Sequence, residues 1–161
     1  AHYRLTIMGF YSITSKQTLP ITLDEAWDFF SSPRNLSKIT PKEMGFIITN
    51  TPSPKMFEGQ IITYKVSPVL GVKINWMTEI TTVKEGEYFI DEQRFGPYAL
   101  WHHRHSFKAV PGGVQMNDEV NYKLPFGILG DIAHALFVKN KLKHIFAYRE
   151  KVLVEMFGAL E

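Results

Sequence analysis

The sequence predicts one α+β domain, residues 1–161, in which a long C-terminal helix closes an antiparallel sheet. Three observations support this fold class. The chain has 161 residues, which suits a single domain. Most of residues 45–123 consists of β-forming runs joined by short turns, and short links produce antiparallel strand pairs. From about residue 128 to 157, apolar residues recur with the spacing of a helix.

The first part of the chain is expected to form a strand and two short helices. Residues 3–16 alternate loosely between apolar and polar side chains, which favours a strand. Thr22 and Glu25 have the spacing of a capping box, so a helix is expected to begin directly after Thr22. Ser32 followed by Pro33 combines an N-cap residue with proline at the first helical position, which predicts the second helix.

Six further strands are expected, which makes a sheet of about seven. They cover residues 45–50, 59–67, 72–83, 87–95, 98–109 and 113–123. The final helix would be about 42 Å long, and seven strands make a sheet about 30 Å wide. A strongly curved sheet cannot contact a straight helix everywhere, so we expect a cavity between them. The apolar stripe of this helix should face the sheet and comprises Ile132, Leu136, Leu142, Ile145, Phe146, Val152, Leu153 and Met156.

The last hairpin predicts which side chains face the interior. A two-residue turn at Pro111-Gly112 fixes the register of the two strands that it joins. In this register His105 lies opposite Asp118. The inward row of residues 113–123 is apolar apart from Asp118, and a buried carboxylate needs a partner. The remaining inward pairs are Trp101 with Tyr122, His103 with Val120, and Phe107 with Met116.

The strand at residues 87–95 leaves two alternatives open. In one alternative the residues that face inward are Phe89, Asp91, Gln93 and Phe95, and the count of apolar residues favours it. A tight turn at Gly96-Pro97 favours the other set, because it places Glu92 beside Trp101. A bulge could reconcile the two. Glu79, Glu92 and Arg94 form a charge cluster on one face in either case, and a solvated outer salt bridge is one interpretation of it.

The polar inward residues permit three interpretations. They could form a buried network that only fixes the strand register. They could recognise a ligand, since pockets combine apolar walls with a few placed polar groups. They could also carry chemistry, either as a two-His, one-carboxylate metal site or as a His–Asp acid–base pair. The candidate ligand-binding residues are Trp76, Glu92, Arg94, Phe95, Trp101, His103, His105, Asp118 and Tyr122.

Composition limits the function classes. Lys and Arg are spread along the chain and the net charge is only +2, so a nucleic-acid partner is not expected. There is no Cys, which excludes disulfides and thiolate catalysis. No apolar run approaches a membrane span and residues 1–10 do not resemble a signal peptide, so a cytoplasmic location is expected. Neither a metal nor a cofactor is expected to be resident.

Three stretches of the chain together resemble a known family. They are residues 19–36, residues 91–103 with the sequence DEQRFGPYALWHH, and residues 122–127 with the sequence YKLPFG. Their order resembles the START/polyketide-cyclase-like (SRPBCC) superfamily with the helix-grip fold, and the middle stretch looks like an uncharacterised bacterial subgroup. The resemblance implies a deep hydrophobic cavity under the C-terminal helix. Relatives bind lipids, sterols, polyketides or plant hormones, and no catalytic motif is shared.

The leading hypothesis is therefore a protein that binds a small hydrophobic or amphipathic molecule, such as a lipid-, sterol- or polyketide-like ligand. The alternative is an enzyme of cyclase, dehydratase or isomerase type that uses His103, His105 and Asp118 or Glu92. A module that presents its outer sheet face to a protein partner is the third class. The sequence leaves open whether any reaction is catalysed.

Overall fold

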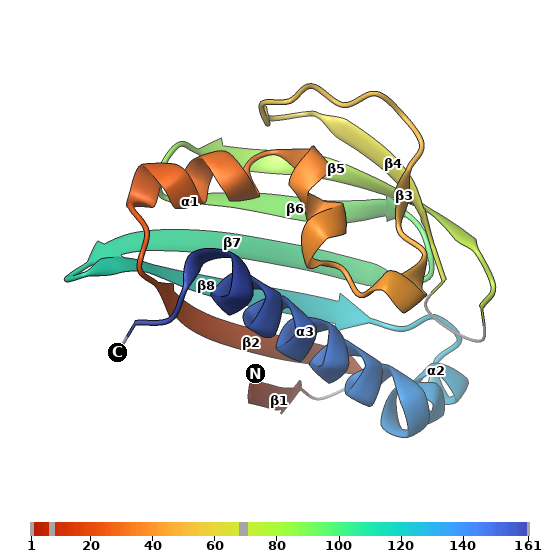
Figure 1. Ribbon diagram of the computed structural model, residues 1–161. Coiled ribbons are helices and arrows are strands. Elements are labelled where there is room, and N and C mark those ends of the chain that lie inside the picture. Colours follow the sequence, from red (N-terminus) through yellow and green to blue (C-terminus); the bar gives the residue numbers. More distant parts are fainter. Residues whose placement is uncertain (1, 7–8, 68–70, 161) are drawn as a thin grey trace.

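The structure is a computed structural model that describes the backbone of residues 2–6 and the whole of residues 9–67 and 71–160 (Figure 1). One antiparallel sheet has the strand order β1-β2-β8-β7-β6-β5-β4-β3. The strands are β1 (His2–Thr6), β2 (Phe10–Leu19), β3 (Ile47–Ile48), β4 (Ile61–Val66), β5 (Ile74–Lys84), β6 (Tyr88–Phe95), β7 (Leu100–Val110) and β8 (Gly113–Lys123). The predicted α+β class is confirmed.

The sheet has eight strands because residues 3–16 form two strands rather than the single strand expected. β1 and β2 pair antiparallel, with Tyr3 opposite Ile13. Gly9 precedes β2 with φ of 72°, a left-handed conformation that glycine adopts at little cost. The strand expected at residues 45–50 is reduced to the two residues of β3.

Three short helices connect β2 to β3. They are α1 (Leu23–Phe30) and the 3₁₀ helices η1 (Pro33–Ile39) and η2 (Lys42–Met44). The capping box of α1 is confirmed, because the Glu25 amide donates to Thr22 Oγ1 at 3.1 Å and Glu25 Oε2 accepts from the Thr22 amide at 2.7 Å. Ser32 precedes η1 as expected, but its side chain makes no capping hydrogen bond.

The C-terminal helix runs diagonally across the face of the sheet that also carries α1 and η1 (Figure 1). It consists of α2 (Ile128–Ala133), the π-helical turn η3 (His134–Val138) and α3 (Lys139–Phe157). Glu150 ties α3 to β2, since its carboxylate accepts from Ser15 Oγ at 2.6 Å and its carbonyl accepts from Gln17 at 2.9 Å. No helix among the described residues is long and apolar enough to cross a membrane.

The predicted apolar stripe of this helix is correct only from Leu142 to Leu153. Leu142, Phe146 and Leu153 are buried, and Ile145 and Val152 pack beside them. Ile132, Leu136 and Met156 are exposed instead. Upstream of Leu142, the positions that face the sheet are Gly130, His134 and Val138. Ile132 and Leu136 lie two residues from His134, about 200° around a helix, and therefore point away from the sheet.

We predict that Thr22→Ala lowers the free energy of unfolding by about 1 kcal/mol, because it removes the side-chain acceptor at the start of α1. Urea unfolding measures the change. Ser32→Ala is the matched control, since Ser32 occupies the same position before η1 without capping it. An equal loss in both variants would contradict the assignment of the cap.

Candidate functional site

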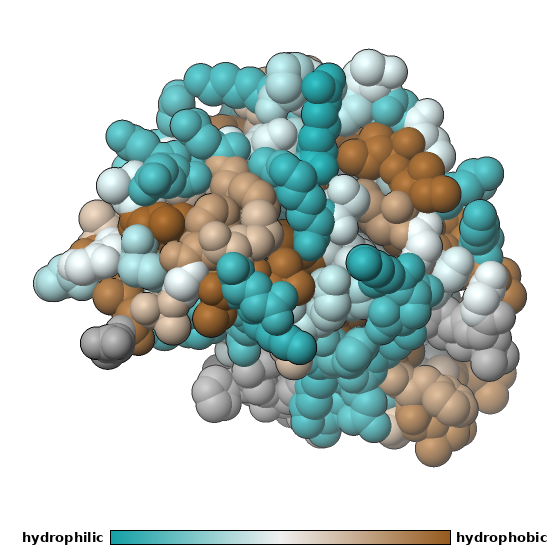
Figure 2. Space-filling model, in the orientation of Figure 1, coloured by the Kyte–Doolittle hydropathy of each residue, from teal (hydrophilic) through white to brown (hydrophobic). Residues whose placement is uncertain are grey.

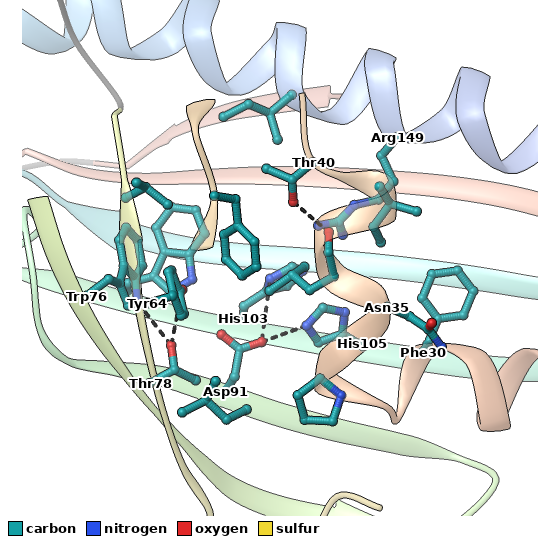
Figure 3. A pocket seen from close by; sticks show the side chains of 18 of the residues that line it. Phe30, Asn35, Thr40, Tyr64, Trp76, Thr78, Asp91, His103, His105 and Arg149 are labelled. Carbon is teal, nitrogen blue, oxygen red and sulfur yellow. Dashed lines mark hydrogen bonds and ion pairs between the residues drawn. The ribbon is translucent and has the colours of Figure 1, made fainter. Parts of the chain in front are cut away.

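A cavity of about 190 Å³ lies between the sheet and the helical layer. Strands β4 to β7 form its floor, and residues of η1 and α3 form its roof. Its wall is largely aromatic and aliphatic, and includes Phe30, Ile62, Tyr64, Trp76, Trp101 and Phe146. Four ionisable side chains interrupt this wall together at one place, Asp91, His103, His105 and Arg149, and Lys141 also belongs to the lining. Figure 3 shows them converging from β6, β7 and α3.

The hairpin of β7 and β8 has the predicted register. Trp101 pairs with Tyr122, His103 with Val120, and His105 with Asp118. Both imidazoles therefore lie on the inner face of the sheet. Asp118 accepts from both of them, with its Oδ1 at 2.8 Å from His103 Nε2 and at 3.0 Å from His105 Nδ1.

Asp91 belongs to the site although it was not among the expected binding residues. Its Oδ2 lies 2.7 Å from His105 Nε2 and 3.7 Å from His103 Nδ1. The alternating set that contains Phe89 and Asp91 is thus the inward one, as the apolar count favoured. Phe89 confirms this orientation, because it is buried and stacks on the His105 ring with centroids 4.2 Å apart.

The connection between β6 and β7 explains why the alternative set was wrong. Glu92 pairs with His102 and not with Trp101, a slip of one residue from the tight turn considered for Gly96-Pro97. The Gln93 side chain bridges this connection, donating to the Tyr98 carbonyl at 2.7 Å and accepting from the Tyr98 amide at 3.0 Å. A one-residue slip turns every side chain of the strand to the other face.

Three expected binding residues, Glu92, Arg94 and Phe95, consequently lie away from the cavity, and Asp118 and Tyr122 are also not among the residues that line it. Arg94 forms ion pairs with Glu79 and, at 3.8 Å, with Glu92, and these side chains lie on the outer face. Phe95 is 64% exposed. The cluster of Glu79, Glu92 and Arg94 is thus the solvated outer salt bridge that was considered for it.

The expected aromatic residues divide between the cavity and the core. Trp76 and Trp101 line the cavity and meet edge to face, with centroids 5.4 Å apart. Trp76 Nε1 donates to Thr78 Oγ1 at 3.0 Å, which fixes the ring. Tyr122 is fully buried behind the lining, and its hydroxyl is 2.8 Å from His134 Nε2.

The two histidines have opposite pKa shifts. Burial lowers the pKa of His103, and the neighbouring His105 lowers it further. Burial also opposes charge on His105, but hydrogen bonds to Asp118 and Asp91 outweigh it and raise the His105 pKa. Burial raises the pKa of each carboxyl group, yet the histidines more than offset it, so the pKa of Asp91 is lowered and that of Asp118 lies well below its usual range.

Arg149 adds a second cation to this network. Its Nη1 lies 3.5 Å from Asp118 Oδ1, and only 11% of its side chain is exposed. A protonated His105 and Arg149 balance the two aspartates, while His103 stays neutral. Arg149 Nε is buried and has no hydrogen-bond acceptor among the described residues. A buried donor without an acceptor costs about 1–3 kcal/mol.

Asp91, His103 and His105 are also close enough to be considered as metal ligands, with donor atoms within 4.8 Å of one another. The two imidazole planes are inclined by only 31°, and the ring centroids are 3.6 Å apart. Imidazole lone pairs lie in the ring plane, so nearly stacked rings do not direct them to one ion about 2.0–2.1 Å away. In this geometry the three residues fit a shared-proton network better than a metal site.

We predict that Asp118→Asn lowers the free energy of unfolding by about 3 kcal/mol, because it leaves buried cations without one of their carboxylates. Urea unfolding at neutral pH measures this loss. Glu92→Gln is the matched control, since it removes a carboxylate from the outer face of β6. A comparable loss in the control would mean that the inner network contributes no more to the free energy of unfolding than the outer salt bridge does.

We predict that the destabilisation caused by His105→Gln depends on pH. Because folding raises the pKa of His105, its protonation stabilises the folded state. This contribution to the free energy of unfolding is fully present below the unfolded pKa of about 6.5. That contribution is lost as the pH rises through the folded pKa. The difference in unfolding free energy from the parent protein should therefore be larger at about pH 6 than at about pH 9. His102→Gln, which removes an imidazole from the opposite face of β7, is the matched control.

Comparison with known proteins supports the fold. No family model matches the chain, and no curated protein matches its sequence. A protein of Arthrobacter aurescens, solved by NMR, is 13% identical with a TM-score of 0.69, covering 99% of this chain and 95% of its own. A protein of Mycobacterium smegmatis is 15% identical with a TM-score of 0.67, covering 97% and 98%. Ara h 8.0201 is 17% identical with a TM-score of 0.59, covering 91% and 99%. Ara h 8 is a Bet v 1-like protein, and this chain shares its helix-grip fold.

Proposed function

We propose that this chain binds a compact amphipathic molecule in its cavity, with an apolar ring against the aromatic wall and an oxygen-bearing group at Arg149. The observation that carries the proposal is the Arg149 side chain, a cation that lines a largely apolar cavity and is 11% exposed there. Placed polar groups in an apolar pocket are what orient small ligands.

The size of the cavity narrows the ligand class. At about 190 Å³ it is smaller than the roughly 300–1,000 Å³ of most small-molecule pockets. A ring system suits this volume better than a long acyl chain. The ring faces of Tyr64, Trp76 and Trp101 offer stacking and edge contacts to such a ring. Among the ligand types that the superfamily resemblance implies, this favours polyketide-like over lipid-like molecules.

The electrostatics favour a ligand with a carboxylate, an enolate or a carbonyl oxygen. Asp91 and Asp118 balance a protonated His105 and Arg149 without a ligand, so a neutral carbonyl is accepted with little change. An anionic ligand would be compensated by proton uptake, and His103 is the neutral group available for it. Desolvation inside the cavity strengthens each of these contacts relative to water.

We predict that Arg149→Met weakens binding of 2-naphthoate about tenfold or more, while binding of neutral naphthalene changes little, because only the carboxylate uses the guanidinium. Quenching of tryptophan fluorescence reports occupancy, since Trp76 and Trp101 line the cavity. Lys151→Met is the matched control on the exposed side of α3. Absence of naphthoate binding to the parent protein, or equal loss in both variants, would contradict the proposal.

A second candidate function is general acid–base catalysis. The observation that favours it is the opposite pKa shift of two adjacent imidazoles at the cavity wall, which is how sites separate an acid from a base. His105 would hold and deliver a proton, and neutral His103 would accept one. Cyclisation, dehydration and isomerisation of carbonyl compounds use such a pair.

This candidate is tested with ring-forming carbonyl substrates. We predict that turnover, where found, falls at least about a hundredfold in His103→Gln and in His105→Gln and is unchanged in His102→Gln. Binding without any turnover across such a panel would leave the chain as a binding protein.

A further inference from the structure

The segment from Pro125 to Phe137, which we call the α2 tip, exposes an apolar surface. Six large apolar side chains in it are between 50% and 83% exposed: Phe126, Ile128, Leu129, Ile132, Leu136 and Phe137. Figure 2 shows brown residues gathered over α2, at the lower right of the molecule. Single exposed apolar residues are ordinary, whereas a contiguous group of this kind marks an interaction surface.

The α2 tip is inverted relative to an ordinary surface helix, because its polar residues point inward. Tyr11 Oη donates to Asp131 Oδ1 at 2.8 Å. His134 is buried, stacks on the Tyr11 ring with centroids 3.5 Å apart, and lies 2.8 Å from the Tyr122 hydroxyl. A helix of a soluble domain normally turns its apolar side to the core. Here hydrogen bonds and stacking hold the polar side to the sheet, and the apolar side is left outside.

The backbone of the α2 tip is held in a defined shape. Phe126 has φ of 70°, a left-handed conformation that is costly for a residue with a side chain, and its ring is 83% exposed. Gly130 packs directly on the preceding turn, because a Cβ there would lie 2.1 Å from the Pro125 carbonyl oxygen. The tip therefore presents its apolar side chains on a fixed turn.

Positive charge accompanies this apolar surface. Residues 123–146 contain four lysines and one aspartate, a formal charge of +3, whereas the whole chain carries +2 and the rest therefore −1. The single aspartate is Asp131, which is turned inward to Tyr11. The lysines are Lys123, Lys139, Lys141 and Lys143, of which Lys141 also lines the cavity.

We propose that the α2 tip docks this protein on the surface of an anionic lipid bilayer. The exposed apolar side chains would enter the boundary between headgroups and acyl chains, which lies about 5–10 Å deep, and the lysines would contact anionic headgroups. The positive charge favours an anionic bilayer over a second copy of the chain as the partner. A symmetric pairing of two tips would bring the same lysines against each other, and like charges across an interface oppose association.

The test is sedimentation of the full chain with vesicles. We predict binding to phosphatidylcholine vesicles that contain about three-tenths phosphatidylglycerol, weaker binding to phosphatidylcholine alone, and loss of the difference as salt rises to about 500 mM. The double variant Phe126→Ser/Leu129→Ser should bind at least about tenfold more weakly, since two apolar side chains no longer enter the bilayer.

Phe57→Ser is the matched control, because Phe57 is 53% exposed and lies outside the α2 tip. Thermal unfolding of both variants shows whether each retains its fold, and Leu136→Ser/Phe137→Ser repeats the experiment if the first variant does not. The proposal is overturned if the parent protein does not bind anionic vesicles or if the tip variants bind as it does. It is also overturned if light scattering shows a dimer that the tip variants dissociate.

Discussion

The pairing of β7 with β8 is the constraint on which the rest of the site depends. Its register places His103 and His105 on the inner face and Asp118 opposite them. Buried charges are tolerated only where they compensate each other, so Asp118, Asp91, His105 and Arg149 must meet within hydrogen-bond or ion-pair distance. The network in turn penalises any slip of the strands, because a one-residue shift would send these side chains to the outer face.

The same network sets where the cavity is polar. α3 crosses the sheet and brings Arg149 to Asp118, while aromatic residues, including those of β4, β5 and β7, form much of the remaining wall. The apolar part of the cavity and its charged end are thus formed by different elements, and each element is held by its own contacts. Glu150 adjoins Arg149 in the sequence and hydrogen-bonds to β2, so this contact helps to fix the position of the guanidinium.

How far the sequence predicts this site depends on the length of the turns. Pro111-Gly112 closes a two-residue turn, and every pair inferred from it, including His105 with Asp118, is found. The connection after β6 is longer and is braced by Gln93, which no local rule indicates, so Glu92 and Arg94 were placed near the site and Asp91 was not. Arg149 was missed because helical spacing locates apolar residues, and nothing in that pattern marks an inward cation. The inverted α2 tip was missed for a related reason, since tertiary contacts of Asp131 and His134 override the apolar periodicity.

A ligand inside the cavity is proposed to meet Arg149 and the two inner histidines, and NMR of the labelled full chain tests this most directly. With 2-naphthoate added, the Arg149 Nε–H signal and the imidazole nitrogens of His103 and His105 should shift together along one saturating curve. The imidazole signals of His102, on the outer face of the same strand, should not shift. Saturation with no change at Arg149 or either inner histidine, or shifts confined to exposed residues, would contradict it.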